Sequence, residues 1–547
     1  MPRAAFGLWY NQACKAEQEL LRREGIDGKA GWRWMGARRR EAVAVGVFLV
    51  AYFLLSLLFL TRYPLVHSDE SWLGGLTRNM MAQGSPMVTE PFFDLKPRYP
   101  HAIKILFHLL QMPFIGVFGY GILAVRLLSL CAGCLALLLV YRIAREVASH
   151  WLSMAMMVTV SLNAVFIAAA HTARQEILLF AMLLWLLLEL VRRKGAIDNA
   201  GARRLGVITG LSVGFHPNSF LLAIGCAMAL LLLMVSQKRF LWKPLLVYIA
   251  ATACVALIFV GLSFLFDSQF PTHYRMYGES EFEITVPLTE KMAGFHDYLS
   301  KLWQGISGTY TLPGLKAQLT ITGILFLMGT VRALQTGQPT LIVMVGMAAG
   351  TLLGTIVIGR YNQLSASLWL LPGLMLLAPL LADLRPLRLL LPALMVLFAV
   401  VSANAVVAAC PYDYGAYLAQ VATYVQPSEK ALANLNTGFY FDNDALLDVR
   451  NLAYLKQNGF TFAEYVHSRG IEVILWPQEM DLIYERRPTF NALYGNPRAT
   501  PEVSVFLQEE CTFLGTFENP GYAVRLAQEI GTAYSVDVYR VNPQAGA

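Results

Sequence analysis

The sequence predicts a polytopic α-helical membrane protein of about eleven spans, followed by a small α/β domain. Three observations lead to this fold class. The chain of 547 residues is 56% hydrophobic and only 14% charged, whereas soluble domains carry about 25% charged residues. Its apolar segments run for roughly 20 residues, the length with which a helix crosses a bilayer. Residues 410–547 have ordinary polarity instead.

Composition and patterning exclude two other classes. The apolar segments are continuous rather than alternating, which excludes a membrane β-barrel. The net charge of +7 does not indicate nucleic-acid binding, because the basic residues form short clusters between apolar segments. Such clusters face the cytoplasm by the positive-inside rule. They are Arg38–Arg40, Arg142 with Arg145, Arg192–Lys194 with Arg203 and Arg204, Lys238 and Arg239 with Lys243, and Arg385 with Arg388.

The spans can be placed in order along the chain. Residues 1–40 contain no apolar run, so we expect a cytoplasmic or interfacial segment there. A membrane domain follows at residues 41–409, and an odd number of spans puts the N-terminus in the cytoplasm and the C-terminal domain outside. We expect the first span to be retained, because no small-residue cleavage site follows it. The expected spans lie at about 42–60, 121–141, 151–170, 177–191, 205–215, 219–236, 244–266, 317–334, 340–358, 365–382 and 389–408.

Two long connections face outward in this arrangement, at residues 61–120 and 267–316. The first is rich in polar groups. Ser68–Gln83 is expected to form a helix along the membrane surface, with Ser68 as its cap and Asp69 and Glu70 in its first turn. Gly84-Ser85-Pro86 ends it, and a second helix is expected at Tyr99–Phe118.

The C-terminal domain, residues 410–547, reads as a small α/β unit. Strands are expected at Phe439–Phe441, Ile471–Trp476 and Ser535–Val541. Helices are expected at Leu446–Asn458 and Phe462–Arg469. The domain has no nucleotide-binding glycine loop, so the sequence assigns it no chemistry.

Cysteine and histidine usage gives no clear metal or disulfide scaffold. Of seven cysteines, Cys410 and Cys511 fall in or beside the C-terminal domain, and a disulfide between them is left open if that domain is extracytoplasmic. The cofactor is unknown: a divalent metal is left open, but no motif points to one. The histidines His67, His101, His171 and His216 lack the spacing of metal ligands.

The topology brings several polar segments to the same outer face. They are the first loop, the turn Arg174–Glu176, the helix break His216–Asn218, the second loop and the turn Arg360–Tyr361. Carboxylates and cations at a membrane surface suit sugar transfer from a lipid-linked phosphate. An acceptor hydroxyl needs a carboxylate as general base, and a departing phosphate needs cations.

The first loop also resembles a known family. Asp69-Glu70 is followed by Arg78-Asn79-Met80, Gly84, Phe93 and Lys96-Pro97. This run is similar to the first outer loop of the bacterial lipid A aminoarabinose transferases. Those enzymes, like the protein O-mannosyltransferases (glycosyltransferase family 39), belong to the C-type, or GT-C, membrane glycosyltransferases. The resemblance extends to Arg174-Gln175-Glu176 and to Arg360-Tyr361 with Pro372.

The resemblance implies an inverting glycosyltransferase of the plasma (inner) membrane. It would move a hexosyl or pentosyl unit from a polyprenyl-phosphate donor to a glycolipid, protein or cell-wall acceptor at the extracytoplasmic face. Asp69 would be the base that activates the acceptor, or would orient it, with Glu70 and Glu176 as further catalytic acids. The donor phosphate would be bound by Lys96, Arg78, Arg98, Arg174, Arg360 and Tyr361, and His216 and Asn218 would line the cavity.

The sequence departs from the family pattern at several positions. Leu95 stands where the family has an acid before the lysine, Arg98 stands at its second proline, and Trp72 replaces an arginine. These differences leave the sugar open. The alternative class is a multi-span transporter or a protein that binds lipid carriers without transferring sugar. Transporters often have helix breaks in both halves, whereas this sequence has one, at Pro217.

Overall fold

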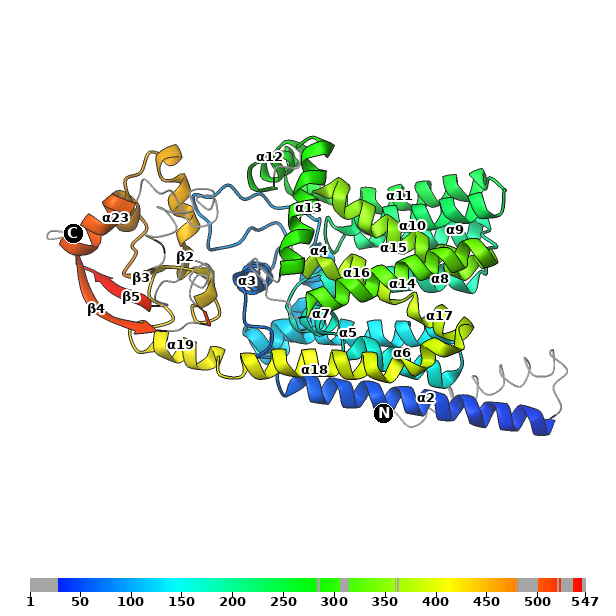
Figure 1. Cartoon of the computed structure of the whole chain (residues 1–547). Helices are drawn as coiled ribbons and strands as arrows, with labels where there is room; N and C mark the ends of the chain where they lie inside the picture. Colours follow the sequence, from blue (N-terminus) through cyan, green and yellow to red (C-terminus); the bar gives the residue numbers. More distant parts are fainter. Residues whose placement is uncertain are drawn as a thin grey trace, which may run out of the picture. The chain divides into compact units, whose positions relative to one another are not determined.

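The computed structural model describes residues 28–282, 286–304, 314–359, 361, 364–478, 480, 500–518, 521–522 and 535–543 (Figure 1). The chain divides into two compact units, Met1–Leu54 and Leu55–Ala547. The described part of the first unit belongs to helix α2 (Gly28–Leu57). The cytoplasmic or interfacial segment expected at residues 1–40 falls mostly on residues 1–27, which lie outside the described residues.

Helix α3 (Ser68–Gln83) has the bounds that the sequence predicts, but its cap is His67 rather than Ser68. The His67 backbone is extended, so its Nδ1 can accept a hydrogen bond from the amide of Asp69 at 2.9 Å. The amide of His67 donates to the carboxylate of Glu70 at 3.0 Å, which completes a capping box. At the other end Gly84 adopts a φ of 60°, where a side chain would be strained.

The second helix of the first loop begins later than predicted. Helix α4 spans Ile105–Phe118, six residues shorter at its start than the expected Tyr99–Phe118. Pro100 disfavours helical backbone in Tyr99 before it. Lys104, with a φ of 93°, is in the left-handed region, so the right-handed helix begins only at Ile105.

The chain is a polytopic helical membrane protein. Among the described residues, eight helical segments are long and apolar enough to cross a membrane, or up to nine if the bent pair α6–α7 is one span. Helices α6 (His150–Ser161) and α7 (Ala164–His171) meet at 66°. The spans expected at 177–191 and 205–215 correspond to the shorter helices α8 (Glu176–Arg192) and α9 (Asn199–Ser212). The eight segments are Arg39–Leu57 in α2, α5 (Ile122–Arg145), α10 (Ser219–Ser236), α11 (Trp242–Phe266), α14 (Leu315–Thr336), α15 (Pro339–Ile358), Leu364–Asp383 with α16 (Ser367–Leu374) and α17 (Leu377–Asp383), and Leu391–Ala422 with α18 (Leu391–Ala409) and α19 (Tyr414–Ala422).

The membrane helices differ in how much of their surface the rest of the protein buries. The segment Leu364–Asp383 is wholly covered by other parts of the protein, whereas only 11% of the apolar window in α11 is buried. An apolar helix that the protein leaves uncovered is the one expected to face lipid. Among the described residues of the connection at 267–316, two further helices form, α12 (Phe270–Phe282) and α13 (Leu288–Gln304).

The C-terminal region contains a five-stranded sheet of order β2-β1-β3-β5-β4. Strands β2, β1 and β3 pair in parallel, and β5 pairs antiparallel with β3 and β4. Helices α20 (Phe462–Ser468) and α23 (Thr500–Glu509) accompany them. The strands are β1 (Ala431–Ala433), β2 (Leu446–Asp448), β3 (Val473–Pro477), β4 (Cys511–Glu518) and β5 (Ser535–Val541).

The local predictions in this region are confirmed in part. Strands β3 and β5 and helix α20 lie where the sequence predicts them. Phe439–Phe441 is wrong as a strand, because it forms a turn whose two phenylalanine rings fill the core under the sheet. Leu446–Asn458 is wrong as an α-helix, because its first residues pair in parallel with β1 and only short 3-10 turns follow.

One apolar core joins this sheet to the first outer loop. It contains Phe92 and Phe93 of the loop and Val125 of α5, together with Leu446 and Val473 of the sheet. The region after residue 410 therefore packs directly on the loop that carries Asp69.

Candidate functional site

The N-terminal end of α3 is fixed by a buried ion pair. Arg126, in the second turn of α5, donates from Nε to Glu70 Oε2 at 2.7 Å and from Nη2 to Oε1 at 2.6 Å. Both side chains have no exposed surface. Glu70 also accepts from the amides of His67 and Ala173, and Arg126 Nη1 donates to the carbonyl of Leu60 at 2.7 Å.

This arrangement does not support the catalytic role that the sequence suggested for Glu70. Its two carboxylate oxygens already meet four donors, and no substrate can reach a side chain with no exposed surface. Glu70 instead ties α3 to α5 and to the turn before α8. Arg126 was not among the predicted residues, although a charged residue inside a predicted span is a signal for such a partner.

Asp69, the neighbouring acid, lies in a different environment. Its carboxylate accepts from Arg174 Nη1, and 30% of its side chain is exposed. Arg174 also donates to both oxygens of Glu176, at 3.2 Å from Nε and 2.9 Å from Nη2. Glu176 is buried, with 1% of its side chain exposed. The structure therefore brings these three predicted residues together, and Asp69 is the acid among them that solvent can reach.

One turn further along α3, cationic side chains lie close to the ring of Trp72. Its ring centroid lies 5.0 Å from Lys96 Nζ and 5.1 Å from Arg98 Cζ. Its Nε1 donates to Glu90 at 2.6 Å, and Arg98 forms a bidentate pair with the same carboxylate. Burial opposes ionisation of Glu90, but the Arg98 guanidinium outweighs it and lowers the pKa of the Glu90 carboxyl well below its usual range.

A third cation at Trp72 comes from the C-terminal region. Arg450 Cζ lies 4.7 Å from the Trp72 centroid, and Arg450 is paired with the fully buried Asp448. Asp448 is the last residue of strand β2, and Arg450 lies two residues beyond it. No chemistry was predicted for this region, and no local signal in the sequence marks Arg450 as a neighbour of Lys96.

Arg78, predicted to bind phosphate, docks the C-terminal region instead. Its Nη1 donates to the carbonyl of Phe441 at 2.7 Å, and its guanidinium lies 4.0 Å from the ring centroid of Tyr120. The neighbouring Asn79 accepts from Asn443 at 3.0 Å. These contacts hold the turn after β1 against α3.

The other predicted residues in the described part of the chain have contacts elsewhere in the membrane domain. Tyr361 donates from its hydroxyl to the carbonyl of Lys291 in α13 at 2.5 Å. His216 Nδ1 accepts from the amide of Asn218 at 3.0 Å, and the Asn218 amide group donates to Ser365 at 3.4 Å. Arg360 lies outside the described residues.

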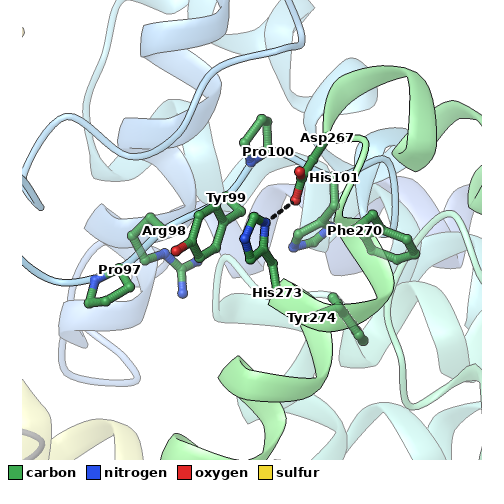
Figure 2. A pocket seen from close by; sticks show the side chains of 9 residues that line it. All are labelled: Pro97, Arg98, Tyr99, Pro100, His101, Asp267, Phe270, His273 and Tyr274. Atoms are coloured by element: carbon green, nitrogen blue, oxygen red, sulfur yellow. Dashed lines mark hydrogen bonds and ion pairs between the residues drawn. The ribbon is translucent and has the colours of Figure 1, made fainter.

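A small pocket lies where the first outer loop meets α12 (Figure 2). His273 and Asp267 form a close pair there, 2.6 Å apart between Nδ1 and Oδ2. The ring of Tyr99 stacks on His273 with centroids 3.6 Å apart. Burial lowers the pKa of the nearby His101 to about 3, so that imidazole is neutral. Arg98 also lines the pocket, so the same stretch of loop contributes to both the pocket and the Trp72 cluster.

Metal and disulfide expectations can be compared with the described residues. Among them, no group of three or more histidine, cysteine or acidic side chains could hold a metal ion. Cys410 and Cys511 are both free, so the disulfide that the sequence left open is not formed. Cys410 is exposed at the end of α18, while Cys511 begins β4 and packs against the core of the sheet.

Comparisons with known proteins give matches of structure only. No family model matches the chain, and no curated protein matches it. The oligosaccharyltransferase AglB from Archaeoglobus fulgidus, in complex with an inhibitory peptide and a dolichol-phosphate, aligns with a TM-score of 0.50. That alignment has 12% identity and covers 87% of this chain and 73% of AglB. ArnT from Cupriavidus metallidurans, bound to undecaprenyl phosphate, aligns with a TM-score of 0.46 and 14% identity over 92% of this chain and 99% of ArnT.

At 12% identity the likeness to AglB is one of fold. Both solved proteins are GT-C glycosyltransferases. This chain shares its fold with AglB, a GT-C glycosyltransferase.

Proposed function

We propose that this protein transfers a monosaccharide from a polyprenyl-phosphate donor to an acceptor hydroxyl. One observation carries the proposal: Asp69 and Trp72 lie one turn apart on α3, where residues three apart are neighbours on the helix surface. The solvent-accessible carboxylate of Asp69 thus lies next to the Trp72 ring, which is close to the charged groups of Lys96 and Arg98. A base and a set of phosphate-binding cations are the two components that this reaction needs.

In the proposed mechanism Asp69 takes the proton of the acceptor hydroxyl as that oxygen attacks the anomeric carbon. The bond from that carbon to the phosphate oxygen breaks at the same time. Attack from the side opposite the leaving phosphate inverts the anomeric centre. Lys96 stabilises the charge that develops on the polyprenyl phosphate, as a preorganised cation does. Arg174 orients Asp69, and Glu176 in turn orients Arg174 without touching substrate.

The direction of helix α5 supports an extracytoplasmic site. Arg126 near its start holds Glu70, while Arg142 and Arg145 lie in its last turns. A helix of 24 residues is about 36 Å long, enough to cross the bilayer. If the basic end faces the cytoplasm, then α3, Asp69 and the C-terminal sheet are on the outer side of the plasma (inner) membrane. The N-terminus is then cytoplasmic.

The chemistry of a GT-C relative agrees with this donor class, since AglB was solved with a dolichol-phosphate. Hexosyl or pentosyl donors and glycolipid, protein or cell-wall acceptors all remain within the proposal. Arg360 and Tyr361 are kept as phosphate ligands, and His216 and Asn218 as cavity residues, because of the resemblance described above. Broken helices such as the bent pair α6–α7 also occur in transporters. In this protein, however, α7 leads into the turn that carries Arg174.

The test is a donor panel with purified protein in detergent. Radiolabelled polyprenyl-phosphate sugars are offered with water, lipid and peptide acceptors, and released or transferred sugar is counted. We expect at least one donor to be consumed. Lys96→Gln should weaken donor binding by about 10- to 100-fold, the range for a charge-assisted hydrogen bond. Lys301→Gln is the matched control, because Lys301 is exposed on α13 and pairs with Asp297. Absence of binding to every donor in the panel would overturn the proposal.

A further inference from the structure

Arg450 and Lys96 lie over the same two aromatic rings, although 354 positions separate them in the sequence. Arg450 Cζ is 4.7 Å from the Trp72 centroid and 5.1 Å from that of Phe93. Lys96 Nζ is 5.0 Å and 5.2 Å from the same centroids. The rings themselves meet edge to face, with centroids 4.9 Å apart. The two cations therefore belong to one compact cluster.

Hydrogen bonds join the segment that carries Arg450 to the segment that carries Lys96. The amide of Asp448 and the Nδ2 of Asn451 both donate to the carbonyl of Phe92, at 3.1 Å and 2.8 Å. The Oδ1 of Asn451 accepts from the amides of Leu95 and Lys96, at 3.3 Å and 3.2 Å. These hydrogen bonds hold the backbone of the two segments in register, so the position of Arg450 relative to Lys96 is set by the fold.

The guanidinium itself is held by a neighbouring carboxylate. Asp448 accepts from Nε and Nη2 of Arg450 at 2.5 Å and 3.1 Å, and also from the amide of Leu435 at 3.0 Å. Arg450 is largely buried, with 7% exposed, and Asp448 is fully buried. Asp448 therefore fixes the orientation of the guanidinium, a planar group whose geometry matches that of a phosphate.

We infer that Arg450 of the C-terminal region binds the phosphate of the lipid donor together with Lys96 of the first outer loop. The inference rests on the proposed function and extends it, because the phosphate site is then complete only when the C-terminal sheet is docked. The ligand class is a polyprenyl phosphate monoester or its glycosyl diester. Arg450 touches the phosphate, while Asp448 and Asn451 act as positioning residues.

The test measures binding of a radiolabelled short-chain polyprenyl phosphate to purified full-length variants in detergent. Arg450→Gln should raise the Kd about 10- to 100-fold, and Arg450→Lys should raise it less. Binding of the corresponding polyprenol, which lacks the phosphate, should not change. Arg469→Gln is the matched control. Arg469 also links the C-terminal region to the loop, through an ion pair with Asp94, but it lies over Phe460 and Tyr465 rather than over Trp72.

The outcomes separate this inference from the proposed function. If Lys96→Gln loses phosphate binding while Arg450→Gln keeps the wild-type Kd, Arg450 is not a ligand and the proposed function stands. If wild type binds polyprenol and polyprenyl phosphate equally well, the phosphate site itself is wrong. If Arg469→Gln weakens binding as much as Arg450→Gln, the effect reflects docking of the C-terminal region and the inference is overturned. Thermal unfolding of each variant shows whether it is folded. If Arg450→Gln does not fold, the Kd of Arg450→Lys for polyprenyl phosphate decides instead.

Discussion

Replacing Arg126 by methionine tests whether the buried ion pair at α3 is a scaffold. The change removes both hydrogen bonds from Arg126 to Glu70 and leaves that carboxylate with two backbone donors, the amides of His67 and Ala173. Neither partner has any exposed surface, so solvent cannot compensate the remaining charge. Breaking such a pair from one side costs about 3–5 kcal/mol. We expect the free energy of unfolding of Arg126→Met to fall by that amount.

The measurement is unfolding of purified variants in detergent, followed by intrinsic fluorescence. The double variant Glu70→Gln/Arg126→Met should be more stable than Arg126→Met alone, because no uncompensated charge is then buried. Arg192→Gln is the control: it breaks an exposed pair with Glu146 and should change stability by less than about 1 kcal/mol.

Two results would refute this reasoning. One is an Arg126→Met variant as stable as wild type, which would mean that the pair contributes nothing to the fold. The other is a Glu70→Gln variant that keeps full stability but loses turnover. That outcome would return Glu70 to the catalytic role first suggested by the sequence.

Two further predictions concern the same region. A Cβ at Gly75 would lie 2.0 Å from Cζ of Phe92, which is 1% exposed, so Gly75→Ala should destabilise the protein by about 1–3 kcal/mol. Gly323→Ala, at a helical glycine with nothing within 4 Å, should be neutral or slightly stabilising, and equal thermal unfolding of the two variants would contradict the packing described. Burial lowers the pKa of His101 from 6.5 to about 3, so between these values the unfolded chain binds a proton that the folded chain does not. Stability should therefore fall as pH drops from about 6.5 toward 3, and His101→Phe should show a smaller fall in pH-dependent unfolding; identical curves would show that His101 does not contribute.

Much of the membrane fold and the ends of α3 could be predicted from the sequence, because the signals are local. Long apolar runs set the membrane helices, and Gly84 sets the end of α3. The cap was misassigned by one residue, since the imidazole of His67 can do what the Ser68 hydroxyl was expected to do.

The site was only partly predictable, because its partners are distant in sequence. Asp69 and Lys96 could be named from the loop, but their partners are set by the tertiary fold. Arg174 lies 105 positions from Asp69. Arg450 lies within Leu446–Asn458, which was expected to be helical, whereas in the structure the parallel pairing of β2 with β1 brings it to Trp72. One sequence carries no signal for such pairings.

The most direct measurement of the central claim compares donor binding and turnover in Asp69→Asn. If Asp69 is the general base, the variant should bind the polyprenyl-phosphate sugar with a Kd within a few-fold of wild type. Its rate of sugar transfer should fall by about 100- to 10,000-fold, the usual contribution of a positioned base. Asp94→Asn, at a loop acid that pairs with Tyr465 and Arg469, should transfer sugar at close to the wild-type rate. An Asp69→Asn variant that turns over at the wild-type rate would contradict the account.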